Sequence, residues 1–148
     1  MRGRAGREQD EGNVIIQTYN PDSFPIECAK DQDYLKFYDQ EIKLRKILKY
    51  PPFCDIIRVE VSSLNEEETR KTITSMYEKL LKHNDKEMSI FAPMPSPISK
   101  IKNRYRWRII IKCLIGNNVI RKLDETTKSI KTNQDTRISV DINPNNMN

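Results

Sequence analysis

The chain has 148 residues, which is enough for one domain with a hydrophobic core and a short additional segment. Hydrophobic residues make up 36% and charged residues 32%, and the net charge of +5 permits a polyanionic partner without requiring one. No apolar run approaches the roughly 20 residues that cross a bilayer, and the amino terminus lacks the apolar core of a signal peptide. We therefore exclude a membrane protein and expect a cytoplasmic one.

The first feature along the chain is a glycine–arginine loop, Gly3-Arg4-Ala5-Gly6-Arg7, followed by the apolar stretch Val14 to Tyr19. Glycines let the backbone turn sharply, and two guanidinium groups three residues apart can contact phosphate oxygens during nucleotide hydrolysis. For these five residues taken alone, a solvated basic turn is the alternative. Val14 to Tyr19 is predicted to form a short strand, and we expect residues 1 to about 30 to be loosely held.

A helix is predicted next, from Tyr34 towards Lys49. Asp33 precedes it as an N-cap, and Pro51-Pro52 ends it, because proline cannot donate a backbone hydrogen bond. This helix occupies a linking region over residues 33–53, which separates an amino-terminal region, 1–32, from a carboxy-terminal domain, 54–148.

The carboxy-terminal domain follows a regular order of elements. Sequence patterns predict strands at 56–63, 89–92, 105–114 and 136–142, helices that begin after Asn65 and at Asn117 or Asn118, and an extended proline-rich loop at 93–97. The order strand–helix–strand–strand–helix–strand is the split βαβ arrangement. It predicts an α+β, ferredoxin-like fold with two helices on one face of a four-stranded antiparallel sheet, because its crossovers are right-handed.

The strand at 105–114 separates two kinds of side chain, because successive residues of a strand point to opposite faces. One face receives the aromatic and apolar residues Tyr105, Trp107, Ile109 and Ile111. The other receives the basic residues Arg104, Arg106, Arg108 and Lys112. We interpret the first face as the helix-covered core and place the basic residues on the uncovered face.

The basic residues of the strand at 105–114 and Arg104 form a stripe of positive charge, and further basic residues extend it. Arg58 lies beside it if the strands follow the ferredoxin order, and Lys100 and Lys102 continue it into the preceding loop. Stripes of this kind bind phosphates through counterion release, without reading sequence. The alternative is a solvated sheet face on which Glu60 and Asp141 neutralise some of the charge.

An RNA-recognition module has the same topology and places aromatic residues on its open face to stack bases. Here the aromatic residues of the strand at 105–114 lie on its apolar side, and the sequence lacks the glycine–aromatic octapeptide of such modules. The sequence therefore favours contact with phosphates or protein over base stacking.

Catalytic and metal-binding groupings are not found in the sequence. Cys28, Cys54 and Cys113 are odd in number and widely spaced, and His83 is the single histidine. We expect reduced, partly buried thiols, and we predict neither a metal site nor a bound cofactor in this chain.

Several motifs carry a family resemblance. The loop at 3–7 resembles motif VI, the arginine-finger motif of superfamily 2 helicases. Blocks at 14–21, 34–53, 91–98, 104–107 and 138–144 are similar to the primosomal protein N′ family, the bacterial replication-restart helicases, in order and spacing over nearly the whole chain. Helicase motif VI normally carries a glutamine before its first glycine, whereas this chain starts at Met1-Arg2. We therefore expect the carboxy-terminal piece of a longer protein.

The resemblance implies the chemistry of the intact protein, which is ATP-driven 3′→5′ unwinding at stalled forks and loading of the replicative helicase. ATP and Mg would be its cofactors, with zinc bound upstream of this chain. Arg4 and Arg7 would contact the γ-phosphate, and Gly3 and Gly6 would belong to the nucleotide-binding loop. Residues 1–32 would be a remnant of the second helicase lobe, so this chain should not hydrolyse ATP by itself.

The carboxy-terminal domain resembles the ferredoxin-like domain of S10-type ribosomal proteins. In the family it would hold branched or forked DNA at the nucleoid, or the acidic tail of single-strand-binding protein, alongside other primosome proteins. Two alternatives stay open. The basic face could dock on helicase lobes or primosome partners as a protein-interaction module, or the domain could be an RNA-binding, S10-like module.

Overall fold

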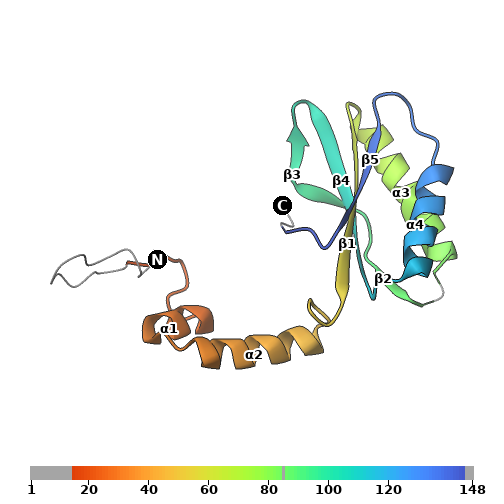
Figure 1. The fold of residues 1–148 in the computed structure, drawn as a ribbon. Helices are drawn as coiled ribbons and strands as arrows, with labels where there is room; N and C mark the ends of the chain where they lie inside the picture. Colours follow the sequence, from red (N-terminus) through yellow and green to blue (C-terminus); the bar gives the residue numbers. More distant parts are fainter. Residues whose placement is uncertain (1–14, 85, 146–148) are drawn as a thin grey trace, which may run out of the picture. The chain divides into compact units, whose positions relative to one another are not determined.

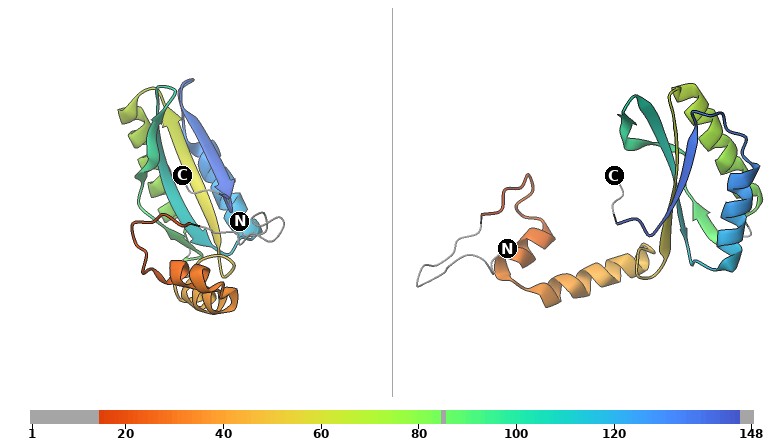
Figure 2. Two further views of the ribbon diagram at one scale, coloured as in Figure 1. Left: turned by 90° about the vertical axis from the view of Figure 1, so that its left-hand side faces the viewer. Right: turned by 45° about the horizontal axis from the view of Figure 1, so that its top comes forward.

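The computed structural model describes residues 15–84 and 86–145 (Figures 1 and 2). The chain comprises two compact units, residues 1–43 and 44–148. The residues expected to form the nucleotide-binding loop, Gly3, Arg4, Gly6 and Arg7, lie outside the described residues. The division into 1–32, 33–53 and 54–148, and the assignment of 1–32 to a helicase lobe, stay predictions.

The first unit contains helix α1 (Phe24–Asp31) and most of helix α2 (Tyr34–Ile47). The predicted cap of α2 is confirmed, because the backbone N–H of Lys36 donates to Asp33 Oδ1 over 2.9 Å. The predicted strand over Val14–Tyr19 is wrong for its described part, since residues 15–19 form no strand. An isolated strand needs a neighbour to pair with. The side chains of Ile15 and Tyr19 are exposed instead.

The second unit has the predicted ferredoxin-like α+β fold. Its strands pair antiparallel in the order β2-β4-β1-β5, and α3 and α4 cover one face of the sheet (Figure 1). The elements are β1 (Asp55–Ser63), α3 (Glu66–Lys82), β2 (Met88–Ile90), β3 (Met94–Ile101), β4 (Arg104–Cys113), α4 (Asn117–Ser129) and β5 (Arg137–Ile142).

The sheet has a fifth strand, β3, where the sequence predicted an extended loop at 93–97. Strands β2 and β3 pair in succession with the same edge of β4. Pro95 and Pro97 cannot donate to a ladder, but an edge strand tolerates them, and the register of β3 shifts between Pro95 and Lys100. Lys102 and Asn103, with φ of 48° and 62°, make the tight turn into β4.

The hydrophobic core lies between the sheet and the two helices. The side chains of Ile57, Val59, Val61, Ile109 and Ile111 are 0% exposed, and Trp107 packs against them. This confirms the predicted faces of the strand at 105–114. The helices contribute Ile73, Met76, Leu80, Val119 and Leu123.

The cap of α3 and the thiols also follow the sequence analysis. Asn65 Oδ1 accepts a hydrogen bond from the Glu68 N–H over 3.1 Å and so begins α3. Cys28, Cys54 and Cys113 are free thiols, and the first and last are buried. Burial, with smaller contributions from Asp55 and Cys54, raises the pKa of Cys113 to about 11, so its thiol stays protonated at neutral pH.

Candidate functional site

The face of the sheet turned away from α3 and α4, which we name the open face, is strongly basic. Strand register places alternate residues of β1, β4 and β5 on it. On the described residues of these three strands, the open face has six cationic and two anionic side chains. The cations are Arg58, Arg104, Arg106, Arg108, Lys112 and Arg137, and the anions are Glu60 and Asp141.

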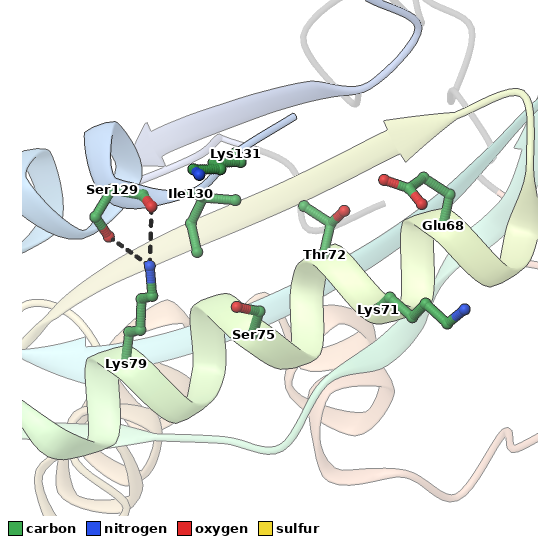
Figure 3. A pocket seen from close by; sticks show the side chains of 8 residues that line it. All are labelled: Glu68, Lys71, Thr72, Ser75, Lys79, Ser129, Ile130 and Lys131. Atoms are coloured by element: carbon green, nitrogen blue, oxygen red, sulfur yellow. Dashed lines mark hydrogen bonds between the residues drawn. The ribbon is translucent and has the colours of Figure 1, made fainter. Parts of the chain in front are cut away.

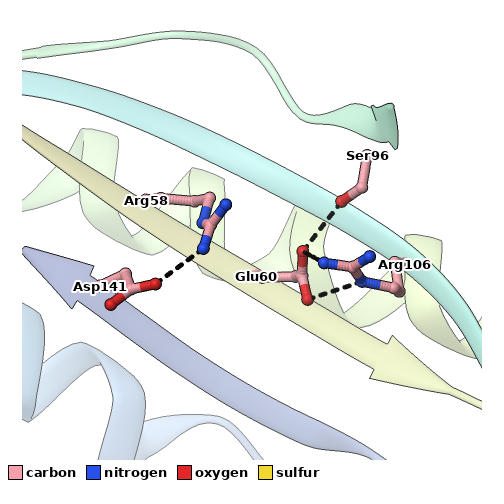
Figure 4. A network of polar contacts seen from close by, with 5 residues as sticks. All are labelled: Arg58, Glu60, Ser96, Arg106 and Asp141. Atoms are coloured by element: carbon pink, nitrogen blue, oxygen red, sulfur yellow. Dashed lines mark hydrogen bonds and ion pairs between the residues drawn. The ribbon is translucent and has the colours of Figure 1, made fainter. Parts of the chain in front are cut away.

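Two of these arginines are paired with the two acids (Figure 4). Arg106 donates from Nε to Glu60 Oε1 over 2.9 Å and from Nη2 to Oε2 over 2.8 Å. Ser96 Oγ, from β3, donates to the same Glu60 Oε2 over 3.1 Å. Arg58 Nη2 donates to Asp141 Oδ2 over 2.7 Å. Glu60 and Asp141 therefore neutralise part of the stripe, as the alternative interpretation predicted, and four more cations than anions stand on these strands.

The two pairs differ in the exposure of the acid, because the Arg58 side chain is only 15% exposed. The side chains of Glu60 and Arg106 are 15% and 17% exposed, whereas that of Asp141 is 57% exposed. A two-pronged guanidinium–carboxylate contact fixes the orientation of both groups. The centre of the open face is therefore a rigid polar platform, and its β5 margin is open to solvent.

Other cations of the stripe are held by backbone oxygens. Arg104 Nη2 donates to the carbonyl oxygens of Ser62, over 3.2 Å, and Asp135. Lys112 Nζ donates to the carbonyl oxygen of Leu48 over 3.2 Å. These contacts retain the positive charge, because a carbonyl does not neutralise it, and they fix where that charge stands.

The two lysines expected to extend the stripe lie elsewhere. Lys100 is the register partner of Tyr105, and its Nζ lies 3.2 Å from the Tyr105 hydroxyl and 4.5 Å from the ring centre. Tyr105 alternates with the arginines of β4, so Lys100 stands on the opposite face of the sheet. Lys102 is exposed in the turn between β3 and β4. The basic stripe therefore ends at Arg104, because the register shift in β3 changes which face Lys100 occupies.

One member of the open face was not among the predicted residues. Arg137 pairs in register with Ser62 and is exposed on the edge strand β5. The alternation of Arg137, Ser139 and Asp141 against apolar residues contained this information. The basic strand at 105–114 carried more charge, and the prediction followed that strand.

A second polar site lies on the helix side, in a hollow of about 380 Å³ (Figure 3). Lys79 Nζ donates there to the Ser129 carbonyl over 2.9 Å and to its Oγ over 3.0 Å, which ties α3 to the end of α4. This is a structural contact. Among residues 15–84 and 86–145, no group of three or more acidic, histidine or cysteine side chains is arranged to hold a metal ion. The hollow is lined by Glu68, Lys71, Thr72, Ser75, Lys79, Ser129, Ile130 and Lys131.

Fold and site together define a ferredoxin-like α+β domain whose open face is basic and whose other face is covered by helices. The chain belongs to the primosomal protein N C-terminal domain family, whose family model matches residues 46–145. The predicted family resemblance is thereby confirmed.

Curated relatives match the chain over most of its length. It is 32% identical over 144 residues to the replication restart protein PriA of Borreliella burgdorferi, covering 97% of this chain and 22% of that protein. The identity to the PriA of Bacillus subtilis is 37% over 151 residues, covering 97% and 18%. For Synechocystis PriA it is 39% over 115 residues, covering 76% and 14%. The chain thus spans between 14 and 22% of the length of these relatives.

The membrane question has a direct structural answer for the described part of the chain. No helix within residues 15–84 and 86–145 is long and apolar enough to cross a bilayer.

Proposed function

We propose that the chain is the carboxy-terminal part of an ATP-dependent 3′→5′ DNA helicase that restarts stalled replication forks, and that residues 44–148 bind DNA through the open face. The proposed process, replication restart, is taken from the names of the relatives. The observation that carries the DNA-binding proposal is the excess of cations on the open face. Cations held on a rigid surface attract phosphates, and the release of counterions from DNA drives the association.

The arrangement suits contact with the DNA backbone. Backbone contacts position a protein on DNA without reading the base sequence. Arg137 lies exposed at the β5 margin, where a phosphate can reach it, while Arg106 is engaged by Glu60. We therefore assign the first contact to Arg137 and a supporting electrostatic role to the paired arginines.

In the intact protein, we assign the glycine–arginine loop to ATP hydrolysis. Arg4 and Arg7 would contact the γ-phosphate of Mg-bound ATP, and Gly3 and Gly6 would let the loop approach it. Residues 1–32 would belong to the second helicase lobe, and zinc would be held upstream. This chain should show no ATPase activity by itself, because the sequence contains no phosphate-cradling glycine loop.

The open face also suits acidic proteins, so the acidic tail of single-strand-binding protein and other primosome proteins are proposed partners. A protein with these ligands works in the cytoplasm, at the nucleoid. DNA remains the principal proposed ligand, because a polyanion with regularly spaced charges uses the whole stripe.

The test is a titration of forked, duplex and single-stranded DNA into the chain at low and at physiological salt. Arg137→Ala should weaken binding on every sequence and flatten the salt dependence by about 0.9 in log–log slope on duplex, the equivalent of one phosphate contact. Arg121→Ala is the matched control, because Arg121 lies on α4, on the other side of the sheet, and its side chain is 67% exposed.

Equal losses for both variants would mean that net charge acts without a defined surface. Unchanged DNA binding in Arg137→Ala, together with weaker binding of an acidic peptide, would make the open face a protein-docking surface instead.

A further inference from the structure

One end of the open face carries aromatic side chains beside a lysine. Lys112 Nζ lies 3.5 Å from the ring centre of Tyr50 and 5.7 Å from that of Phe91. Phe91 extends β2 along β4, with its N–H bonded to the Ile110 carbonyl over 2.9 Å, and so shares the open face with Lys112. The aromatic residues of the open face thus come from outside the strand that carries the arginines. Together, Tyr50, Phe91 and Lys112 form the aromatic end of this face.

The position of Tyr50 is fixed by its own backbone. The Tyr50 N–H donates to the Arg45 carbonyl over 2.8 Å, and its carbonyl accepts from the Phe53 N–H over 2.9 Å. Arg45 Nη1 also donates to the Pro51 carbonyl over 3.1 Å. A ring placed in this way costs little additional ordering when a ligand stacks on it, which favours binding.

Both rings stay accessible although each contacts a cation. Tyr50 is 42% and Phe91 43% exposed. The cation–π contact with Lys112 explains how the segment around Tyr50 is held against β4. It leaves unexplained why two aromatic side chains remain half in solvent at the end of a row of arginines.

Rows of cations that lead to exposed aromatic rings are typical of surfaces that bind single-stranded nucleic acid. The cations follow the phosphates, and the rings stack the bases. Lys112 and Arg104 lie eight residues apart on β4, a span of roughly 26 Å at about 3.3 Å per residue. That length accommodates several nucleotides of an extended strand. Bases inside an intact duplex are not available for stacking.

We propose that the aromatic end stacks an unpaired base of single-stranded DNA whose phosphates follow the arginines of the open face. This inference rests on the proposed DNA-binding function and adds a preference for unpaired strands. The sequence analysis disfavoured base stacking, because the aromatic residues of β4 lie on the helix-covered face. The rings proposed to stack a base belong instead to Tyr50 and Phe91, which lie outside β4.

The test compares three probes on the full chain: a short oligothymidylate, an abasic oligonucleotide of the same length, and a blunt duplex. We expect the oligothymidylate to bind more tightly than the abasic strand. Phe91→Leu should weaken oligothymidylate binding by roughly 5- to 150-fold, the effect of one lost base–aromatic stack, and should leave the abasic strand and the duplex unchanged. Tyr38→Leu is the matched control, because Tyr38 is an exposed aromatic residue of α2 at 48% exposure.

A second readout needs no substitution. An oligothymidylate carrying photoreactive thiothymidine should cross-link to Tyr50 or Phe91, as mapped by mass spectrometry. Cross-links on the arginines with none on either ring would overturn the inference, as would equal affinity for thymidylate and abasic strands. Weaker binding of an acidic peptide by Phe91→Leu, with thymidylate binding unchanged, would identify a protein-docking site instead. If Arg137-dependent duplex binding persists in any of these cases, the proposed function stands, whereas failure of every DNA probe would refute it.

Discussion

The two faces of the sheet are built from the same strands yet are stabilised in different ways. On the helix-covered face, Val59 and Ile109 are register partners and are 0% exposed. On the open face, Glu60 and Arg106 keep only 15% and 17% of their side chains exposed. The open face achieves this shielding through paired charges, with Ser96 of β3 completing the contact.

The difference shows which changes each face tolerates. Apolar packing is non-directional, so its loss scales with the area and cavity that a substitution creates. A shielded ion pair depends on both partners, because removing one leaves the other charge without compensation. The helix-covered face should therefore determine stability, and the open face should depend on which charges remain together.

The largest effect is expected on the helix-covered face. Ile111→Ala should destabilise the domain by about 2–5 kcal/mol, because Ile111 is 0% exposed in the core of the second unit. Urea unfolding followed by circular dichroism measures this loss. DNA affinity of the folded variant should stay unchanged, and a loss below about 1 kcal/mol would show that the core does not dominate stability.

An intermediate effect is expected at the shielded ion pair. Arg106→Ala should cost about 1–3 kcal/mol, because it leaves the Glu60 carboxylate, which is 15% exposed, without its guanidinium. The double variant Glu60→Ala with Arg106→Ala should recover part of this loss. Urea unfolding of the two single variants and the double variant gives the coupling energy directly.

The more exposed pair on the same face provides the control. Arg58→Ala removes the partner of Asp141, which is 57% exposed, and should cost no more than about 1 kcal/mol. If Arg58→Ala and Arg106→Ala cost the same, shielding would not explain the difference between the two pairs.

The sequence predicted the faces of the main strands because alternation is a local property. Every second residue is apolar along β4 and from Ile57 to Val61 in β1, and burying that side determines the register of each strand. The ferredoxin-like order followed from the sequence of elements. Arg137 could have been placed on the open face by the same rule.

Features that depend on a neighbour were missed. The pairing of β3 depends on the free edge of β4, and its prolines concealed the strand. The face of Lys100 depends on the register shift after Pro95. Tyr50 and Phe91 meet Lys112 only through tertiary packing, for which no local spacing exists.

The smallest charge-dependent effect is expected where both faces end, at a clamp between β1 and the residue after β5. Asn143 Nδ2 donates to Asp55 Oδ1 over 2.8 Å, and the Ile115 N–H donates to Asp55 Oδ2 over 2.9 Å. The bond from Asn143, followed by that from Ile115, lowers the pKa of Asp55 below its ordinary value of 3.8. A lowered pKa means that the folded state favours the charged carboxylate. The resulting stabilisation is complete above pH 3.8 and is lost as the pH falls through the folded-state pKa.

Asn143→Gly tests this clamp without backbone strain, because Asn143 has a φ of 48°, which glycine adopts readily. The part of the loss that comes from the Asp55 contact should be less than about 1 kcal/mol at neutral pH, as is usual for accessible charged contacts. The variant also loses the hydrogen bond from the Ile56 N–H to Asn143 Oδ1, 3.0 Å long, and gains a flexible glycine, and neither of these losses depends on pH. The part due to Asp55 should therefore shrink as the pH falls below 3.8, and urea unfolding across the acidic range measures it. Asp55→Asn cannot titrate, so in that background Asn143→Gly should show a pH-independent effect. A loss of constant size at every pH in the parent chain would mean that the clamp acts through backbone geometry rather than through the carboxylate charge.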